Sequence, residues 1–164
     1  MDPAQWLQLQ RTIRFGETDA AGVMHFHVLL RWCHEAYEES LERFGLPAAS
    51  IFPQPGWAQA PAGASSNQAA QPQASVALPI VHCEADFRRP LLCGDVLTIK
   101  LQPERLDPGT FTLQCHFWRQ GEAVATGLTR HLAIEASSRR RCPLPDGINR
   151  WLEASSLGFG IRPL

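Results

Sequence analysis

The sequence of 164 residues lacks the features that define several large classes of protein. Its formal net charge at pH 7 is -1, so it has no excess of basic residues for binding nucleic acid or an anionic membrane surface. No uninterrupted apolar run approaches the roughly 20 residues that a membrane-spanning helix needs. The first residues, MDPAQ, contain neither the basic nor the apolar part of a secretory signal. We therefore expect a cytoplasmic protein that binds neither nucleic acid nor membrane.

Metal and disulfide chemistry also lack a sequence signal. The five cysteines are an odd number, and no two of them have the CxxC spacing of a structural zinc site. We expect them to be reduced thiols. His25, His27 and His34 lie close in sequence, but the last two are about two helical turns apart and no HExxH motif is present. We expect no bound metal.

Residues 27–44 are predicted to form one long amphipathic helix. Apolar side chains recur there at steps of three and four residues, which is the period of a helix with one buried face. They are Leu29, Leu30, Cys33, Ala36, Tyr37, Leu41 and Phe44. The sequence Gly45-Leu46-Pro47 follows and supplies the glycine, the apolar residue and the proline that commonly end a helix. A rod of this length, about 27 Å, crosses a whole sheet.

The segment before this helix, residues 6–15, alternates in the pattern of a half-buried strand. One face of that strand would carry Leu7, Leu9, Arg11, Ile13 and Phe15. The alternation then breaks at a short acidic turn that ends in Asp19, and a linker containing Gly22 leads into the helix.

Residues 53–75 interrupt the chain with a low-complexity stretch rich in Pro, Gln, Ala, Gly and Ser and without any charged residue. Such a composition buries too little apolar surface to offset the entropy lost on ordering. We predict a mobile loop inserted within a single domain that spans residues 1–164. Trp57, the large aromatic residue of the stretch, is expected to pin part of the loop to the surface.

Four further strands are predicted after residue 76, because polar and apolar residues alternate in four segments that end at turn sequences. On residues 122–135, one face consists almost entirely of small residues, which would let another element pack closely. A short helix is predicted at residues 145–154, with Asp146 as its N-cap. Its buried side would carry Ile148, Trp151 and Leu152. One apolar helix against a five-stranded antiparallel sheet is the simplest α+β solution.

The segment FGETDAAGVMHF, residues 15–26, followed by the long helix, resembles the hotdog-fold acyl-CoA thioesterases of the 4-hydroxybenzoyl-CoA thioesterase type. Residues 78–87, LPIVHCEADF, and residues 94–100, GDVLTIK, are similar to the family's second and third strands. The resemblance implies a hotdog fold, in which a five-stranded antiparallel sheet wraps around one long helix. Within the family, the sequence ETDAAGVMHF is most similar to that of cyanobacterial members that hydrolyse 1,4-dihydroxy-2-naphthoyl-CoA in phylloquinone synthesis.

The resemblance also assigns roles to residues. It implies that Asp19 is catalytic and that the main-chain N–H of Phe26, seven residues later, binds the developing oxyanion. Thioester hydrolysis needs a nucleophile or base, and the carboxylate of Asp19 could attack the carbonyl or activate water. The free N–H groups and the dipole of a helix N-terminus favour an oxyanion. Gly22 would allow close approach of the main chain to the substrate, and His25 would line the acyl pocket.

Alternative interpretations exist for several of these residues. Asp19 could be only a turn or helix-cap residue. Glu17 could support Asp19 without contacting the substrate, or could be an exposed loop acid. His82 could form part of the pocket wall or be an ordinary surface histidine on a strand. The sequence also lacks the GxSxG motif and the glycine-rich nucleotide-binding fingerprints, so a serine hydrolase and a nucleotide-binding enzyme are both unsupported.

The implied substrate is an aromatic acyl-CoA, with CoA as part of the substrate and no separate cofactor. Its phosphates could be bound by Arg88 and Arg89 or by the run 139–141, although surface arginines are common. The family forms dimers with active sites between subunits, so we expect a homotetramer built from dimers. Two other functions stay open: hydrolysis of hydroxybenzoyl-CoA, fatty acyl-CoA or acyl carrier protein, and acyl-CoA binding without catalysis.

Overall fold

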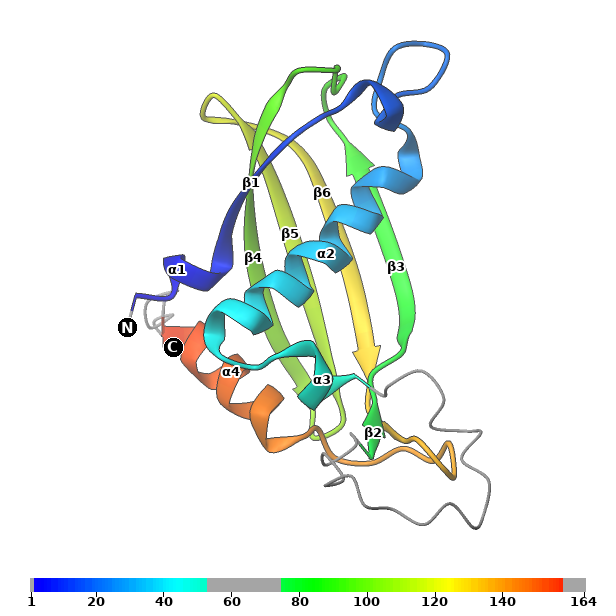
Figure 1. Cartoon of the computed structure of the whole chain (residues 1–164), viewed down its shortest axis with the longest axis vertical. Coiled ribbons are helices and arrows are strands. Elements are labelled where there is room, and N and C mark those ends of the chain that lie inside the picture. Colours follow the sequence, from blue (N-terminus) through cyan, green and yellow to red (C-terminus); the bar gives the residue numbers. More distant parts are fainter. Residues whose placement is uncertain (1, 53–74, 158–164) are drawn as a thin grey trace, which may run out of the picture.

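The computed structural model describes residues 2–52 and 75–157 and contains an antiparallel sheet of five strands in the order β1-β4-β5-β6-β3 (Figure 1). These strands are β1 (Gln8–Thr12), β3 (Ile80–Phe87), β4 (Val96–Asp107), β5 (Thr110–Arg119) and β6 (Glu122–Leu132). The long helix α2 (Phe26–Phe44) crosses one face of this sheet (Figure 1). The predicted α+β arrangement of one long helix against five antiparallel strands is therefore confirmed.

Helix α2 begins one residue before the predicted start and ends at the predicted residue. Gly45 adopts a left-handed conformation with φ of 97°, which glycine reaches without the steric cost of a Cβ. Its N–H donates to the carbonyl of Glu42, and the N–H of Leu46 donates to that of Leu41 at 2.9 Å. This pair of hydrogen bonds satisfies carbonyls that the end of a helix otherwise leaves free.

The small face of β6 is the face on which α2 packs. Ala125 and Thr129 are almost fully buried there, as the sequence predicted for an element that approaches closely. The contact is tightest at Gly127, where an added Cβ would lie 2.5 Å from the Sγ of Cys33 on α2. A residue with any side chain at this position would therefore push the helix away from the sheet.

The N-terminal segment differs from the prediction of one strand over residues 6–15. It forms a short helix α1 (Ala4–Leu7), then β1, then a 3-10 turn η1 (Phe15–Glu17). The buried positions Leu9 and Ile13 agree with the predicted face, but the side chain of Phe15 is 84% exposed. The reason is the turn: the backbone N–H of Arg14 donates to a carboxylate oxygen of Glu17 at 2.9 Å, which ends the extended conformation before Phe15.

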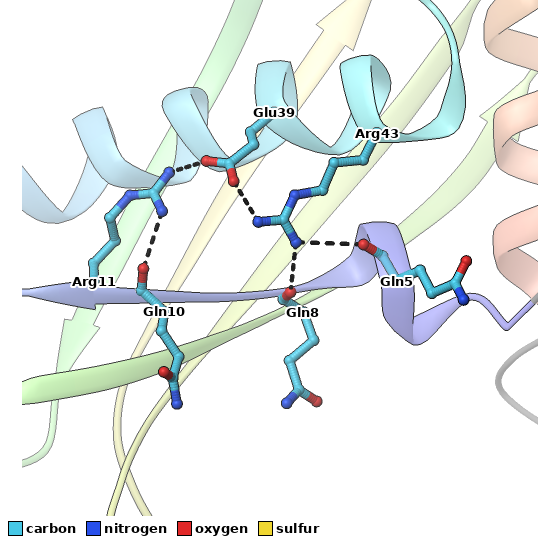
Figure 2. A network of polar contacts seen from close by, with 6 residues as sticks. All are labelled: Gln5, Gln8, Gln10, Arg11, Glu39 and Arg43. Carbon is cyan, nitrogen blue, oxygen red and sulfur yellow. Dashed lines mark hydrogen bonds and ion pairs between the residues drawn. The ribbon is translucent and has the colours of Figure 1, made fainter.

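A charged network joins this segment to α2 (Figure 2). The carboxylate of Glu39 accepts hydrogen bonds from Arg11 of β1 and from Arg43, which lies one helical turn further along α2. Arg43 also donates to the carbonyls of Gln5 and Gln8, both at 3.3 Å, near the end of α1. Partial burial of Glu39 opposes its ionisation, but the hydrogen bonds and charges of the two arginines outweigh this effect and lower its pKa.

The C-terminal part covers one end of the sheet. Helix α4 (Asp146–Ser156) packs beside β4, and its Ile148, Trp151 and Leu152 are buried as predicted. The predicted cap is wrong, because Pro145 holds the N-cap position and Asp146 is the first helical residue. The carboxylate of Asp146 still lies in the first turn, where the helix dipole stabilises it.

The remaining elements lie around the predicted insertion. Helix α3 (Ala48–Ile51) precedes it, and β2 (Val76–Ala77) follows it and pairs with β7 (Ile134–Glu135). The predicted mobile loop at 53–75, with Trp57, lies outside the described residues except for Ser75. Within the described parts of the chain, no helix has the length and the apolar character that a membrane crossing requires.

Candidate active site

Asp19 begins a tight turn in the connection between η1 and α2. Its carbonyl accepts the N–H of Gly22 at 3.0 Å, and its own N–H donates to the carbonyl of Val23 at 2.9 Å. One carboxylate oxygen, Oδ1, accepts the N–H of Ala21 at 2.8 Å. Gly22 has a φ of 80°, a conformation that a residue with a side chain rarely adopts, so this turn depends on glycine. The turn fixes the exposed carboxylate, and its second oxygen has no hydrogen-bond partner among the residues that the structure describes.

Helix α2 begins a few residues after Asp19, with His25 as its N-cap and Phe26 as its first residue. The His25 side chain makes no capping hydrogen bond, and within the described residues the N–H of Phe26 has no acceptor. A free N–H at a helix start, aligned with the positive end of the helix dipole, can donate to an anionic oxygen. This is the chemical role that the resemblance implied for Phe26.

A surface groove of about 480 Å³ brings these groups together. One wall is formed by residues 19–26 and the other by residues 87–91. It is lined by Asp19, Val23, Met24, Phe26, Phe87, Arg88, Arg89, Pro90 and Leu91. Phe26 and Phe87 are 68% and 43% exposed, so the groove offers aromatic surface to a ligand. A carboxylate, a helix N-terminus, two aromatic rings and two guanidinium groups thus share one groove.

The two walls are joined by main-chain contacts. The N–H of Met24 donates to the carbonyl of Leu91 at 2.7 Å, and Val23 forms an isolated antiparallel bridge with Leu92. The second wall is held in turn by Asp95, whose carboxylate accepts the N–H of Leu92 at 2.9 Å and a hydrogen bond from Arg119 at 2.6 Å. Partial burial of Asp95 is outweighed by these two donors, so its pKa is lowered.

The two arginines of the groove have different surroundings. The Nε of Arg89 is 2.7 Å from a carboxylate oxygen of Glu122, so this guanidinium already has an acidic partner. Arg88 forms no ion pair with another described residue. Burial, and secondly the nearby positive charge of Arg88, lower the pKa of His116 on β5. Arg88 is therefore the groove cation with more of its charge available to a ligand.

The structure brings most of the predicted site residues together. Asp19 and Phe26 line the groove and Gly22 belongs to the turn that holds Asp19. His25, which was expected to line the acyl pocket, is not among the residues that line the groove. Its ring lies 5.1 Å from that of Phe26, and its Nδ1 lies 2.8 Å from that of His27. His82 is exposed on β3, 3.3 Å from a carboxylate oxygen of Glu84, and does not line the groove.

Sequence reasoning missed Phe87 and Leu91 as parts of the site. Phe87 ends the segment that the resemblance assigned to a strand, and its exposure at the strand end was not foreseen. The signal was present, because the sequence Phe87-Arg88-Arg89-Pro90 puts an aromatic residue beside two cations where the strand ends. Among the described residues there is no group of three or more His, Cys, Asp or Glu side chains able to hold a metal ion.

Comparison with known families decides the wider identity of this fold and groove. The model of the thioesterase-like superfamily matches residues 13–152, which include both walls of the groove. The chain belongs to the thioesterase-like superfamily. Its fold is the hotdog fold that the resemblance implied, and its curated relatives are named as CoA thioester hydrolases.

This thioesterase is similar over its whole length to curated relatives. It is 56% identical to the 1,4-dihydroxy-2-naphthoyl-CoA hydrolase of Synechococcus sp. (strain CC9605), with 100% of both chains covered. It is 52% identical to the enzyme of that name from Prochlorococcus marinus (strain MIT 9303), covering 96% of this chain and 97% of the relative. The crystal structure of the 1,4-dihydroxy-2-naphthoyl-CoA thioesterase from Synechocystis has a TM-score of 0.70 and 26% identity, covering 89% and 94% of the two chains.

Proposed function

We propose that this thioesterase hydrolyses 1,4-dihydroxy-2-naphthoyl-CoA to the free acid and CoA, as a step in phylloquinone or menaquinone synthesis in the cytoplasm. The observation that carries the proposal is the shared groove, in which the carboxylate of Asp19 and the free N–H of Phe26 lie with aromatic surface. The names of the curated relatives support the aromatic acyl group.

The geometry supports two routes for the reaction. The thioester carbonyl oxygen would accept the N–H of Phe26, which stabilises the negative charge that develops there. The free oxygen of Asp19 then either attacks the carbonyl carbon or accepts a proton from an attacking water. In the first route CoA leaves as the thiolate and water cleaves the acyl-aspartyl anhydride. In the second route the acid and CoA form without a covalent intermediate.

Both groove arginines are placed to bind the negative charge of CoA, and Arg88 is the stronger candidate because it has no ion-pair partner among the described residues. The run at residues 139–141 does not line the groove. Within it, Arg141 is engaged elsewhere, with Asp107 at 3.2 Å and Thr110 at 3.1 Å. The groove is therefore where CoA phosphates are expected, with guanidinium groups as their donors.

A homotetramer built from dimers is part of this proposal. Strand β3 is the last strand of the sheet and pairs only with β6 within the described residues, so its other edge can pair with a second chain. Its Val81 is 53% exposed and Ile80 39% exposed. His82 lies on the same strand, and a contact with substrate would require the groove of a second subunit. Light scattering tests this assembly, and a fully active monomer would contradict it.

The function is tested by measuring release of free thiol from a panel of thioesters. The panel contains dihydroxynaphthoyl-, hydroxybenzoyl- and hexanoyl-CoA and hexanoyl acyl carrier protein. We expect the largest kcat/KM with dihydroxynaphthoyl-CoA. We also expect Asp19→Asn to lose at least about a thousandfold in kcat, because the amide is neither a nucleophile nor a base.

The alternative functions are distinguished by thiol release together with a binding measurement. A higher kcat/KM with the hexanoyl substrates would show that the enzyme acts on fatty acyl thioesters and not on aromatic ones. If the wild-type protein binds CoA esters in calorimetry but releases no thiol from any of them, it is an acyl-CoA-binding protein without catalysis. Asp19→Asn discriminates further, because an enzyme variant would keep CoA-ester binding while losing turnover.

A further inference from the structure

The geometry points to Glu17 as the positioning residue that fixes the distance between the carboxylate of Asp19 and the N–H of Phe26. This inference rests on the proposed function, because it concerns the two groups that act on the thioester. Glu17 lies two residues before Asp19, at the end of η1, and its side chain is only 16% exposed. It does not line the groove.

The carboxylate of Glu17 is held from three directions. Its Oε2 accepts the backbone N–H of Arg14 at 2.9 Å, and this contact closes the turn that precedes the site. Its Oε1 accepts the indole N–H of Trp32 at 3.0 Å and a charged hydrogen bond from Arg31. Arg31 and Trp32 both belong to α2, so the Glu17 side chain ties the start of the loop to the body of the helix.

The main chain of Glu17 closes the other end of the same loop. Its carbonyl accepts the N–H of His25 at 2.8 Å, and His25 is the residue immediately before Phe26. The loop that carries Asp19 therefore starts after Glu17, and its last residue, His25, is hydrogen-bonded back to Glu17. One residue fixes both where the loop begins and where the helix starts.

This double attachment matters because the hydrogen bonds that close the turn around Asp19 stay within residues 19–23, whereas the side chain of Glu17 connects the loop to α2. The distance between the carboxylate and the Phe26 N–H depends on how the loop sits on α2. Displacement of a reacting group by about 1 Å can cost a hundredfold in rate. A weaker tie at Glu17 should thus reduce kcat while leaving the groove able to bind substrate.

Glu17→Gln tests this role. The carboxylate uses both of its oxygens as acceptors, whereas only the oxygen of the amide can accept, so at least one of the three donors loses its partner. We expect kcat to fall about a hundredfold and KM to change by less than about threefold. Glu35→Gln is the matched control. Glu35 also pairs with Arg31, with its Oε1 3.4 Å from Nε, but it has no contact with the loop, so its kcat should stay at the wild-type value.

A second variant removes only one donor. Trp32→Phe keeps an aromatic ring and deletes the indole N–H, so it should lower kcat by less than Glu17→Gln does. Because both changes act on one tie, the double variant should be less impaired than the product of the single effects. The inference would be overturned if the loss of kcat in the double variant equalled the product of the two single losses. It would also be overturned if Glu17→Gln kept the wild-type kcat.

Hydrogen exchange gives a readout that does not need turnover. In Glu17→Gln the amides of residues 18–26 should exchange faster, while those of β5 keep their protection. A uniform rise in exchange across the chain would mean that Glu17 only contributes to global stability, and the inference would fail. If the wild-type protein releases no thiol, the proposed function fails, and this exchange comparison still decides whether Glu17 holds the loop.

Discussion

The imidazole of His131 stacks on the ring of Phe111, with centroids 4.6 Å apart and planes inclined by 3°. Tyr37 lies against the same imidazole at 4.8 Å, and Thr129 is hydrogen-bonded to its Nε2 at 3.0 Å. The residue is 1% exposed. This burial, together with the nearby His34, lowers the pKa of His131 to about 4, against a smaller opposing effect of the Leu78 backbone.

Acid should therefore destabilise the fold through His131. The unfolded chain takes up this proton near pH 6.5 and the folded chain only near pH 4, so the stabilisation is complete above pH 6.5 and is lost as the pH falls between these values. The loss amounts to about 3 kcal/mol. Urea unfolding at pH 7.5 and pH 4.5 should show a smaller drop for His131→Phe, which keeps the ring stack without the titration. An equal drop in both proteins would contradict the role of His131.

Gly127→Ala should destabilise the protein by about 1–3 kcal/mol, because the added methyl group overlaps Cys33 at a packed helix–sheet contact. Thermal or urea unfolding measures this. Gly16→Ala is the control, since a Cβ there meets nothing within 4 Å. Cys33→Ala removes the obstructing sulfur, so the double variant should be more stable than the sum of the single effects predicts. Strict additivity would show that the steric contact with Cys33 is not the cause.

Arg88→Gln should raise KM for acyl-CoA substrates by about tenfold, since a charge-assisted hydrogen bond to phosphate is worth roughly 1.5 kcal/mol or more. The same variant should leave KM unchanged for an N-acetylcysteamine thioester, which carries the acyl group without the phosphates. Arg150→Gln, an exposed change on α4, is the control. A rise in KM for both kinds of substrate would mean that Arg88 shapes the acyl part of the groove instead.

Glu39→Gln should cost about 1 kcal/mol of unfolding free energy at pH 7, because it weakens the partly exposed network in Figure 2. The pKa of Glu39 is lowered in the folded state from an ordinary value of 4.5, so the charge stabilises the fold above that pH and ceases to do so as the carboxylate is protonated. The difference from wild type should therefore shrink as the pH is lowered from 7 to 3. Glu42→Gln, on the same helix and exposed, should change stability by less than half as much.

The sequence was most informative where periodicity and turn chemistry agree. The helix from His27 to Phe44, its glycine end at Gly45 and the small face of the last long strand all follow from local patterns, and the structure confirms them. Asp19 and Phe26 were placed by the resemblance, and the structure brings them to one groove. Their catalytic roles stay predictions.

The errors arose where a specific hydrogen bond or a long-range pairing overrides a local pattern. Phe15 continues an alternating strand in sequence, but the Glu17 turn ends the strand and exposes the ring. Trp32 lies outside the predicted apolar stripe of the helix, yet it is 3% exposed, and its indole N–H donates to the carboxylate of Glu17 across the helix–loop contact. The apolar part of the second wall, Phe87 and Leu91, was missed because a pairing between distant segments leaves no periodic signal.

The pairing of Met24 with Leu91 and of Val23 with Leu92 also has a consequence for the order of folding. These partners are far apart in sequence, so the entropic cost of closing the chain between them is met only after the sheet has brought its strands together. The groove is consequently a late product of folding. A chain that has collapsed and formed α2 would already be compact but still inactive, and recovery of activity during refolding should lag behind recovery of helical circular dichroism.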